Sequence, residues 1–236
     1  MTLTLGAVSG KGGAGKTTIV MLVAGEYALR GKRVLLIDAD ARQNLYEWWK
    51  RCQQKDNAPE GIEIVTVARP DSLEQQLKAA KKFDVVMIDA PGVDGVLTRA
   101  IIKHCDLVLT PIQPAQDEIK AAGEAAQVTG EVSDEIGRPI PQANIVTRVN
   151  ITSRNLEAYR LIRPFVANLR NNEYDSFLLD TELMERNCYR EIRNGLGTLQ
   201  MLDLTQPVMK ARAEVQRLIA ELEGILEMDR KEAVNG

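Results

Sequence analysis

One glycine-rich segment, at residues 10–17, limits the possible folds of this chain more than any other feature. It reads GKGGAGKT and matches the pattern G-x-x-x-x-G-K-[ST] of phosphate-binding loops. An apolar run at residues 3–8, typical of a buried strand, precedes it, and a helical pattern at residues 16–30 follows. Glycines permit positive φ angles, so backbone N–H groups can curl around phosphate oxygens, and the helix N-terminus adds partial positive charge. This order of elements predicts an α/β fold that binds the phosphates of a nucleotide.

The loop gives each of its polar groups an expected role. The Lys16 ammonium should reach the β- and γ-phosphates, and the Thr17 hydroxyl should ligate Mg²⁺. Thr18 is placed to contact the α-phosphate. Because the sequence carries no Asn/Thr-Lys-x-Asp guanine signature, ATP with Mg²⁺ is the expected ligand. The residues expected to bind the nucleotide are Gly12, Gly13, Ala14, Gly15, Lys16, Thr17 and Thr18.

Carboxylates stand at the ends of two further predicted strands. Asp89 closes the apolar run at residues 83–89, and Asp38 and Asp40 follow the run at residues 34–37. Carboxylates at the carboxyl ends of parallel strands suit water-mediated Mg²⁺ binding beside a phosphate loop. We therefore expect Thr17, Asp38 and Asp89 to hold the metal and Asp40 to orient the attacking water. The alternative for Asp38 and Asp40 is a pair of solvated turn acids.

Strand and helix patterns alternate along the whole chain, which predicts one α/β domain over residues 1–236, doubly wound, with a mostly parallel sheet and helices on both faces. A last helix, at about residues 207–227, should dock one apolar face on the body. Asp71 with Glu74 predicts a capping box for the third helix. The expected strands lie at residues 3–8, 33–38, 62–67, 83–89, 106–110, 144–149 and 176–179. The other expected helices lie at residues 16–30, 45–54, 72–82, 96–104, 117–132, 156–170 and 186–194.

Composition narrows the class of protein. The net charge of -3 argues against a globally basic nucleic-acid binder but leaves room for a local basic patch. No apolar run is long enough to span a bilayer, and the N-terminus lacks the features of a signal peptide. Three widely spaced cysteines fit a reducing cytoplasm. His104 is the only histidine, so a multi-histidine metal site is excluded.

Several segments together resemble the ParA/MinD family of deviant Walker A ATPases. Residues 11–18 (KGGAGKTT) resemble its first box, with the extra signature lysine at Lys11. Residues 34–40 (VLLIDAD) resemble its second box, and residues 85–92 (VVMIDAPG) its Walker B segment. Residues 183–189 (LMERNCY) resemble a segment typical of small plasmid-partition ParA proteins. The resemblance covers about residues 3–200, and the compact C-terminal region also resembles VirC-type ParA proteins, which assist conjugative DNA transfer.

The resemblance implies a P-loop NTPase of the ParA/MinD type in which two subunits sandwich two ATP molecules. Lys11 would then reach across to the partner's nucleotide and act as an arginine finger does. The alternative is a solvated loop lysine. The second box departs from the family, because Ala41, Arg42 and Gln43 follow Asp40 where the family usually has Pro-Gln. The switch loop is therefore expected to be built differently.

The resemblance also implies non-specific DNA binding by the ATP dimer. Since the whole chain is acidic, DNA phosphates would have to meet local arginines, and dimerisation would join two weak patches into one. The alternative is a mixed charged surface, because acids interleave with these arginines. The candidate DNA-binding residues are Arg163, Arg170, Arg190, Arg193 and Arg217.

Three classes of function stay open at this point. The first is a DNA-segregation or cargo-positioning ATPase of the cytoplasm, associated with the nucleoid in its ATP state. It would work with a DNA-binding or cargo-adaptor protein that stimulates slow hydrolysis. The second is a MinD-like membrane-cycling regulator, which needs a basic amphipathic C-terminal tip. The tail instead carries Glu221, Glu223, Glu227 and Asp229, so no membrane partner is expected. The third is a metabolic or redox enzyme on the same fold.

Overall fold

The computed structural model describes residues 2–92 and 95–235. Its strands are β1 Leu3–Ala7, β2 Val34–Asp38, β3 Ile62–Thr66, β4 Val85–Asp89, β5 Leu107–Ile112, β6 Gln142–Val149, β7 Ser176–Leu178 and β8 Leu183–Met184. Its helices are α1 Lys16–Leu29, α2 Asn44–Gln54, α3 Pro70–Ala79, α4 Val96–His104, α5 Gln116–Ile136, α6 Glu157–Asn171, α7 Asn187–Arg193 and α8 Gln206–Asn235. None of the helices described is both long and apolar enough to cross a membrane.

The strands form one sheet in the order β3-β2-β4-β1-β5-β6-β7, with β8 paired to β6. Every strand pair in it is parallel. The chain adds β2, β3 and β4 on one side of β1 and the later strands on the other. The strand order therefore reverses at β1, and ligands of open parallel sheets bind at the carboxyl ends of strands beside such a reversal. The phosphate-loop segment follows β1 directly.

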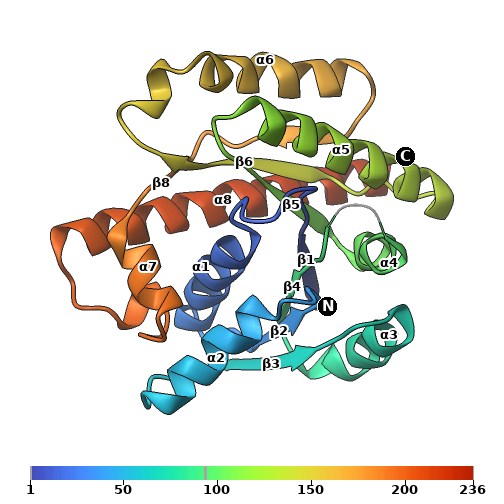
Figure 1. Cartoon of the computed structure of the whole chain (residues 1–236). Coiled ribbons are helices and arrows are strands. Elements are labelled where there is room, and N and C mark those ends of the chain that lie inside the picture. Colours follow the sequence, from blue (N-terminus) through green and yellow to red (C-terminus); the bar gives the residue numbers. More distant parts are fainter. Residues whose placement is uncertain (1, 93–94, 236) are drawn as a thin grey trace.

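Side chains alternate between two layers because successive residues of a strand point to opposite faces. Val34 and Leu36 pack into the core beneath α1, α2, α7 and α8. Leu35 and Ile37 pack into the core beneath α3, α4 and α5. Figure 1 shows these two groups of helices on opposite sides of the curved sheet, with α6 beside α5. The expected doubly wound architecture with helices on both faces is thus confirmed.

Helix α8 continues past the predicted end at residue 227. Val215, Leu218, Ile219 and Leu222 on its apolar face are fully buried in the core that α1 shares. A docked helix gains most of its stability from such packing rather than from local propensity.

Helix α3 begins earlier than expected, at Pro70. Proline suits the first helical position because its missing N–H needs no partner there and its φ is already helical. The Ser72 hydroxyl accepts a hydrogen bond from the Arg69 N–H at 3.3 Å and donates one to the Arg69 carbonyl at 2.7 Å. The predicted capping box of Asp71 with Glu74 is therefore wrong.

Helices α2 and α7 meet end to end. Arg51 Nε donates to the Arg193 carbonyl at 3.2 Å, and Lys55 Nζ donates to the Asn194 carbonyl at 2.8 Å. Cations at a helix C-terminus satisfy carbonyls that have no partner within the helix. Gly195 follows with φ +90°, and an added Cβ there would lie 2.7 Å from that of Arg51. Only glycine therefore fits this junction.

Candidate nucleotide-binding site

The glycine-rich segment forms a loop between β1 and the first residue of α1. Gly13 and Gly15 adopt φ values of +87° and +117°, which side chains rarely tolerate. Among the described residues, none accepts a hydrogen bond from the backbone N–H groups of residues 12–17. Lys16 begins α1 and is 7% exposed. A ring of unpaired N–H donors at a helix N-terminus with a buried lysine is suited to binding a chain of phosphates.

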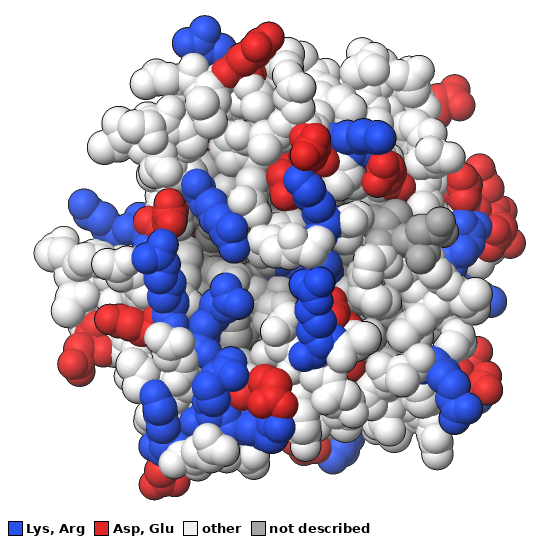
Figure 2. Space-filling model, in the orientation of Figure 1, with Lys and Arg blue, Asp and Glu red and all other residues white. Residues whose placement is uncertain are grey.

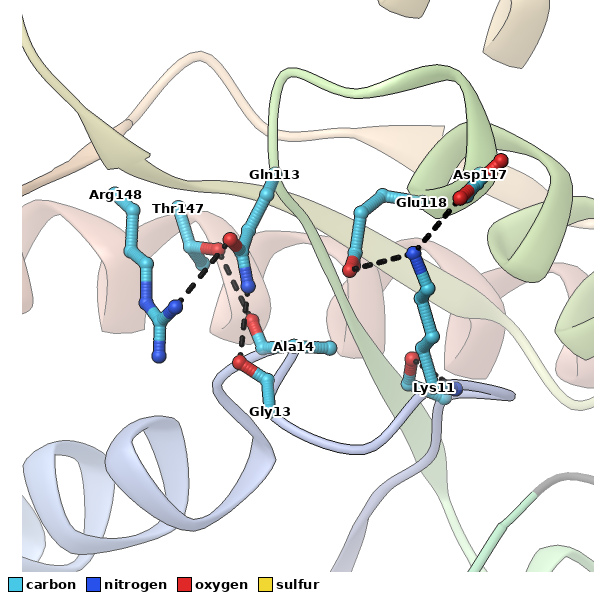
Figure 3. A network of polar contacts seen from close by, with 9 residues as sticks. Lys11, Gly13, Ala14, Gln113, Asp117, Glu118, Thr147 and Arg148 are labelled. Atoms are coloured by element: carbon cyan, nitrogen blue, oxygen red, sulfur yellow. Dashed lines mark hydrogen bonds and ion pairs between the residues drawn. The ribbon is translucent and has the colours of Figure 1, made fainter.

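The outer side of the loop is tied to the ends of β5 and β6 (Figure 3). Gln113 Nε2 donates to the Gly13 carbonyl at 2.9 Å, and Thr147 Oγ1 donates to the Ala14 carbonyl at 3.3 Å. Arg148 Nη1 in turn donates to Gln113 Oε1 at 3.4 Å. Because these bonds satisfy the two carbonyls from outside, they fix the loop while leaving its N–H groups free for a ligand.

Asp89 lies beside the start of α1 and is 1% exposed. Thr17 Oγ1 donates to its Oδ2 at 2.6 Å, whereas its Oδ1 is buried and has no hydrogen-bond partner among the described residues. Burial raises the pKa of Asp89 to about 7, although the Thr17 hydrogen bond and the Lys16 charge act in the opposite direction. A buried carboxylate oxygen without a partner requires an explanation. A bound cation provides one.

The oxygen ligands here fit Mg²⁺ held largely by a nucleotide. No group of three or more His, Cys, Asp or Glu side chains that could hold a metal occurs in the described part of the chain. Mg²⁺ in nucleotide sites commonly uses one or two carboxylates together with phosphate oxygens and water. The Thr17 hydroxyl and Asp89 are placed for that arrangement.

The other acidic strand end lies next to Asp89, since Asp38 of β2 is paired in register with it. Asp38 Oδ2 accepts the Tyr46 N–H at 2.9 Å, and Oδ1 accepts the Asp40 N–H at 3.1 Å. Burial raises the pKa of Asp38. The side chain thus fastens the first turn of α2 to the end of β2, a role that the sequence did not indicate. Its part in metal binding stays a prediction.

Asp40 is half-buried on the turn that follows β2. Its Oδ1 accepts the Arg42 N–H at 2.8 Å, which holds the turn. The Arg42 guanidinium lies against the phosphate loop, with Nη1 3.3 Å from where a Cβ of Gly12 would be. The sequence indicated only that this turn departs from the family, so Arg42 was missed as a site residue.

Lys11 points away from the loop and toward α5 (Figure 3). Its Nζ lies 3.1 Å from Asp117 Oδ2 and 3.9 Å from Glu118 Oε1. Burial raises the pKa of Glu118, and the Lys11 charge opposes this rise. In a single chain, Lys11 therefore pairs with acids at the start of α5.

A pocket of about 260 Å³ opens beside the loop. This volume is just below the usual range for small-ligand pockets, ~300–1,000 Å³. Arg148 at its edge has a left-handed backbone with φ +53°. The pocket is lined by Gly15, Thr18, Ile19, Thr147, Arg148, Leu183, Met184, Glu185, Arg186, Tyr189, Arg190 and Arg193. Its mixed apolar and polar walls, continuous with the phosphate loop, suit a nucleoside.

The base contacts could not be named from the sequence. The one signal for them was the resemblance of residues 183–189 to a ParA segment, and the structure brings that segment to the pocket.

The five candidate DNA-binding arginines are all exposed, but they do not form one patch. Arg190 and Arg193 line the pocket beside the phosphate loop. Arg163 on α6 pairs with Asp180 at 3.1 Å, and the Arg170 guanidinium lies 4.6 Å from the centre of the Phe177 ring. Arg217 on α8 lines a groove that also contains acidic side chains.

A basic surface forms where α2 meets α7, and Figure 2 shows Lys and Arg side chains gathered on this side of the molecule. The basic residues of these two helices are Lys50, Arg51, Arg190 and Arg193. Two of them form ion pairs with described residues, Lys50 with Glu47 and Arg190 with Glu185. This surface could not be predicted from the sequence, because α2 and α7 are far apart in the chain.

The pKa of about 7 at Asp89 predicts pH-dependent Mg²⁺ binding. The metal requires the carboxylate, so protons compete with it below that pH. We expect the affinity for Mg·ADP, measured by calorimetry, to fall about tenfold per pH unit below the pKa and to level off above it. The Asp89→Asn variant should lose this pH dependence. Wild-type protein measured in EDTA, which removes Mg²⁺, should lose it too. A pH dependence of ADP affinity that persists in EDTA would contradict the prediction.

The sequence matches the family model described as VirC1 protein over residues 1–230. A protein named ParA from Rhizobium radiobacter is 29% identical over 210 residues, which cover 87% of this chain and 89% of that protein. A virC1 protein of the same organism is 30% identical over 204 residues, covering 85% of each chain.

Among solved structures, the septum site-determining protein MinD of Pyrococcus horikoshii, complexed with Mg-ADP, has the same fold. It matches with a TM-score of 0.69 at 20% identity, covering 96% of this chain and 99% of that one. The family match spans nearly the whole sequence, and the fold agrees with it. The chain therefore belongs to the VirC1 protein family, within the ParA/MinD group of ATPases.

Proposed function

We propose that this protein is a Mg²⁺-dependent ATPase that dimerises on ATP and then binds DNA without sequence specificity to partition or position a DNA cargo. The observation that carries the proposal is the Thr17–Asp89 contact at the phosphate loop, which leaves one buried carboxylate oxygen for a metal. A DNA-binding or cargo-adaptor protein would stimulate hydrolysis. The relatives named ParA and virC1 support plasmid partition or assistance to conjugative DNA transfer as the cellular task.

In the proposed reaction, the oxygen of water bonds to the γ-phosphorus. The bond from that phosphorus to the bridging oxygen breaks, and its electron pair leaves with ADP. Lys16 and the free N–H groups of the loop hold the phosphates, and Asp40 orients the water. Thr17 and Asp89 would hold Mg²⁺, which when bound would supply positive charge beside the phosphates.

The test of the proposal is ATP-dependent dimerisation, and Lys11→Ala is its most informative variant. The Lys11–Asp117 pair is exposed at both ends, so it is worth only about 0–1 kcal/mol and is easily exchanged for a partner's phosphate. We expect wild-type protein to dimerise with a slowly hydrolysed ATP analogue, whereas Lys11→Ala binds the analogue as a monomer. Light scattering and calorimetry measure the two properties separately.

Lys120→Ala, which removes an exposed lysine of α5, is the matched control and should dimerise normally. A Lys11→Ala protein that still dimerises with the analogue would defeat the role in trans. A wild-type protein that binds no nucleotide would defeat the proposed function as a whole.

DNA binding is expected only in the ATP state. Fluorescence anisotropy with random duplex DNA, measured across a salt series with ADP or the analogue, is the measurement. Arg163→Ala and Arg217→Ala lie outside the nucleotide pocket, so they can weaken DNA binding without weakening nucleotide binding. Each DNA phosphate contact that is lost should lower the salt slope by about one unit on every sequence. Equal DNA binding in both nucleotide states would count against a DNA carrier.

A further inference from the structure

Arg42 is a cation beside the phosphate loop that has no part in the reaction proposed above. It lies on the turn between β2 and α2, where the next residue, Gln43, has a left-handed backbone with φ +49°. The bond from the Arg42 N–H to Asp40 Oδ1 keeps this turn closed. The structure shows no ion pair of the Arg42 guanidinium within residues 2–92 and 95–235. The turn thus presents an uncompensated guanidinium to the phosphate loop.

The two ends of the loop face different surroundings. Gly15 and Thr18 border the pocket that suits a nucleoside. Gly12 borders Arg42 instead, at 3.3 Å from the position of an added Cβ. A nucleotide with its base in the pocket would place its first phosphate near Thr18. Its phosphate chain would then extend along the loop, so the last phosphate would approach Gly12 and Arg42.

We propose that Arg42 contacts the terminal phosphate of the ATP bound by its own chain and assists its hydrolysis. The inference rests on the proposed function. As the bond between the γ-phosphorus and the bridging oxygen breaks, negative charge increases on that oxygen, which becomes part of ADP. The water that attacks the phosphorus gives its proton to solvent as inorganic phosphate forms. A guanidinium has planar, fixed N–H donors that match phosphate oxygens, so it stabilises this charge with little rearrangement.

Lys11 lies on the other side of the loop from Arg42. In the single chain its Nζ is paired with Asp117, on the α5 side of the loop. Arg42 is an exposed cation that lies against the loop near Gly12. Each ATP in a dimer would receive one cation from its own turn and one from the partner's Lys11. It follows that a monomer keeps slow hydrolysis that depends on Arg42.

The experiment compares Arg42→Gln and Arg42→Lys with Arg33→Gln. Arg33 precedes the opposite end of β2 and pairs with Asp84, so this control loses the same charge far from the loop. Calorimetry gives the affinities for ADP and for a slowly hydrolysed ATP analogue, and single-turnover hydrolysis gives the rate. The same rates are measured in a Lys11→Ala background, in which the proposed function expects a monomer.

We expect Arg42→Gln to bind ADP as the wild type does, to bind the analogue about tenfold more weakly and to hydrolyse ATP about 100-fold more slowly. Arg42→Lys should recover part of the rate, and Arg33→Gln should match the wild type. The residual rate of Lys11→Ala should fall when Arg42→Gln is added.

Unchanged rates and analogue affinity in Arg42→Gln would overturn the inference and leave the proposed ATPase intact. Equal losses of ADP and analogue binding would also overturn it, because they would show a role in shaping the loop. Failure of the wild type to bind either nucleotide would instead defeat the proposed function.

Discussion

Substitution of Lys16 by alanine is expected to abolish nucleotide binding. The side chain is 7% exposed and begins α1 beneath the free N–H groups of the loop. Its ammonium would make charge-assisted contacts to the β- and γ-phosphates, each worth about 1.5–3 kcal/mol. Its charge also opposes the rise in the pKa of Asp89. Removing Lys16 would therefore weaken phosphate and metal binding together.

Calorimetry with Mg·ATP should show at least a roughly 100-fold loss of affinity in Lys16→Ala, which corresponds to about 2.7 kcal/mol. Lys32→Ala, an exposed lysine at the other end of the sheet, controls for the lost charge. Thermal unfolding without nucleotide should show that both variants are folded. An unchanged ATP affinity in a folded Lys16→Ala protein would remove the nucleotide assignment.

Substitution of Asp40 is expected to block hydrolysis while ATP still binds. Asp40 follows the strand paired with β4 and is half-buried, so its carboxylate can orient a water at the terminal phosphate. Loss of a group that positions the attacking water should slow hydrolysis by about 100-fold or more. Because hydrolysis ends the ATP state, the dimer of Asp40→Ala should persist in light scattering with ATP itself, without any analogue.

Asp40→Asn separates chemistry from folding of the turn. Its amide oxygen can still accept the Arg42 N–H, whereas alanine removes that acceptor. Both variants should lose hydrolysis if the charge of Asp40 is what orients the water. Asp203→Ala, an exposed acid in the loop before α8, is the control and should hydrolyse ATP normally. Normal turnover by Asp40→Asn would assign Asp40 a structural role in the turn.

The phosphate loop and the buried strands could be predicted from the sequence because their signals are local. Glycines at fixed offsets specify the loop, and continuous apolar runs specify strands covered on both faces. The helix at Val96–His104 was predicted with the same bounds. Strand β8 was missed, since Leu183–Met184 is too short to show any periodicity. Its pairing with β6 shifts register between Thr147 and Val149.

The roles of several site residues depend on the path of the backbone between elements, which local sequence patterns do not encode. That Asp38 holds the metal stays a prediction, and its two oxygens also accept backbone N–H groups that the turn into α2 brings to it. Arg193 was predicted only as a DNA-binding residue, and α7 carries it to the pocket beside the phosphate loop. Arg42 carries no motif, and only the path of its turn places it against Gly12.

The end-to-end junction of α2 and α7 means that α2 connects the turn after β2 to the wall of the pocket. Asp38 accepts a hydrogen bond from the first turn of α2. At the other end, Arg51 and Lys55 donate to the carbonyls at the C-terminus of α7. An 11-residue helix spans about 16 Å, so a shift of the turn that holds Asp40 would move a wall of the pocket beside the phosphate loop at that distance. Departure of the terminal phosphate near the N-terminus of α2 would then weaken binding of the base near its C-terminus. Through this linkage, the rate of ADP release would depend on a helix that does not itself line the pocket.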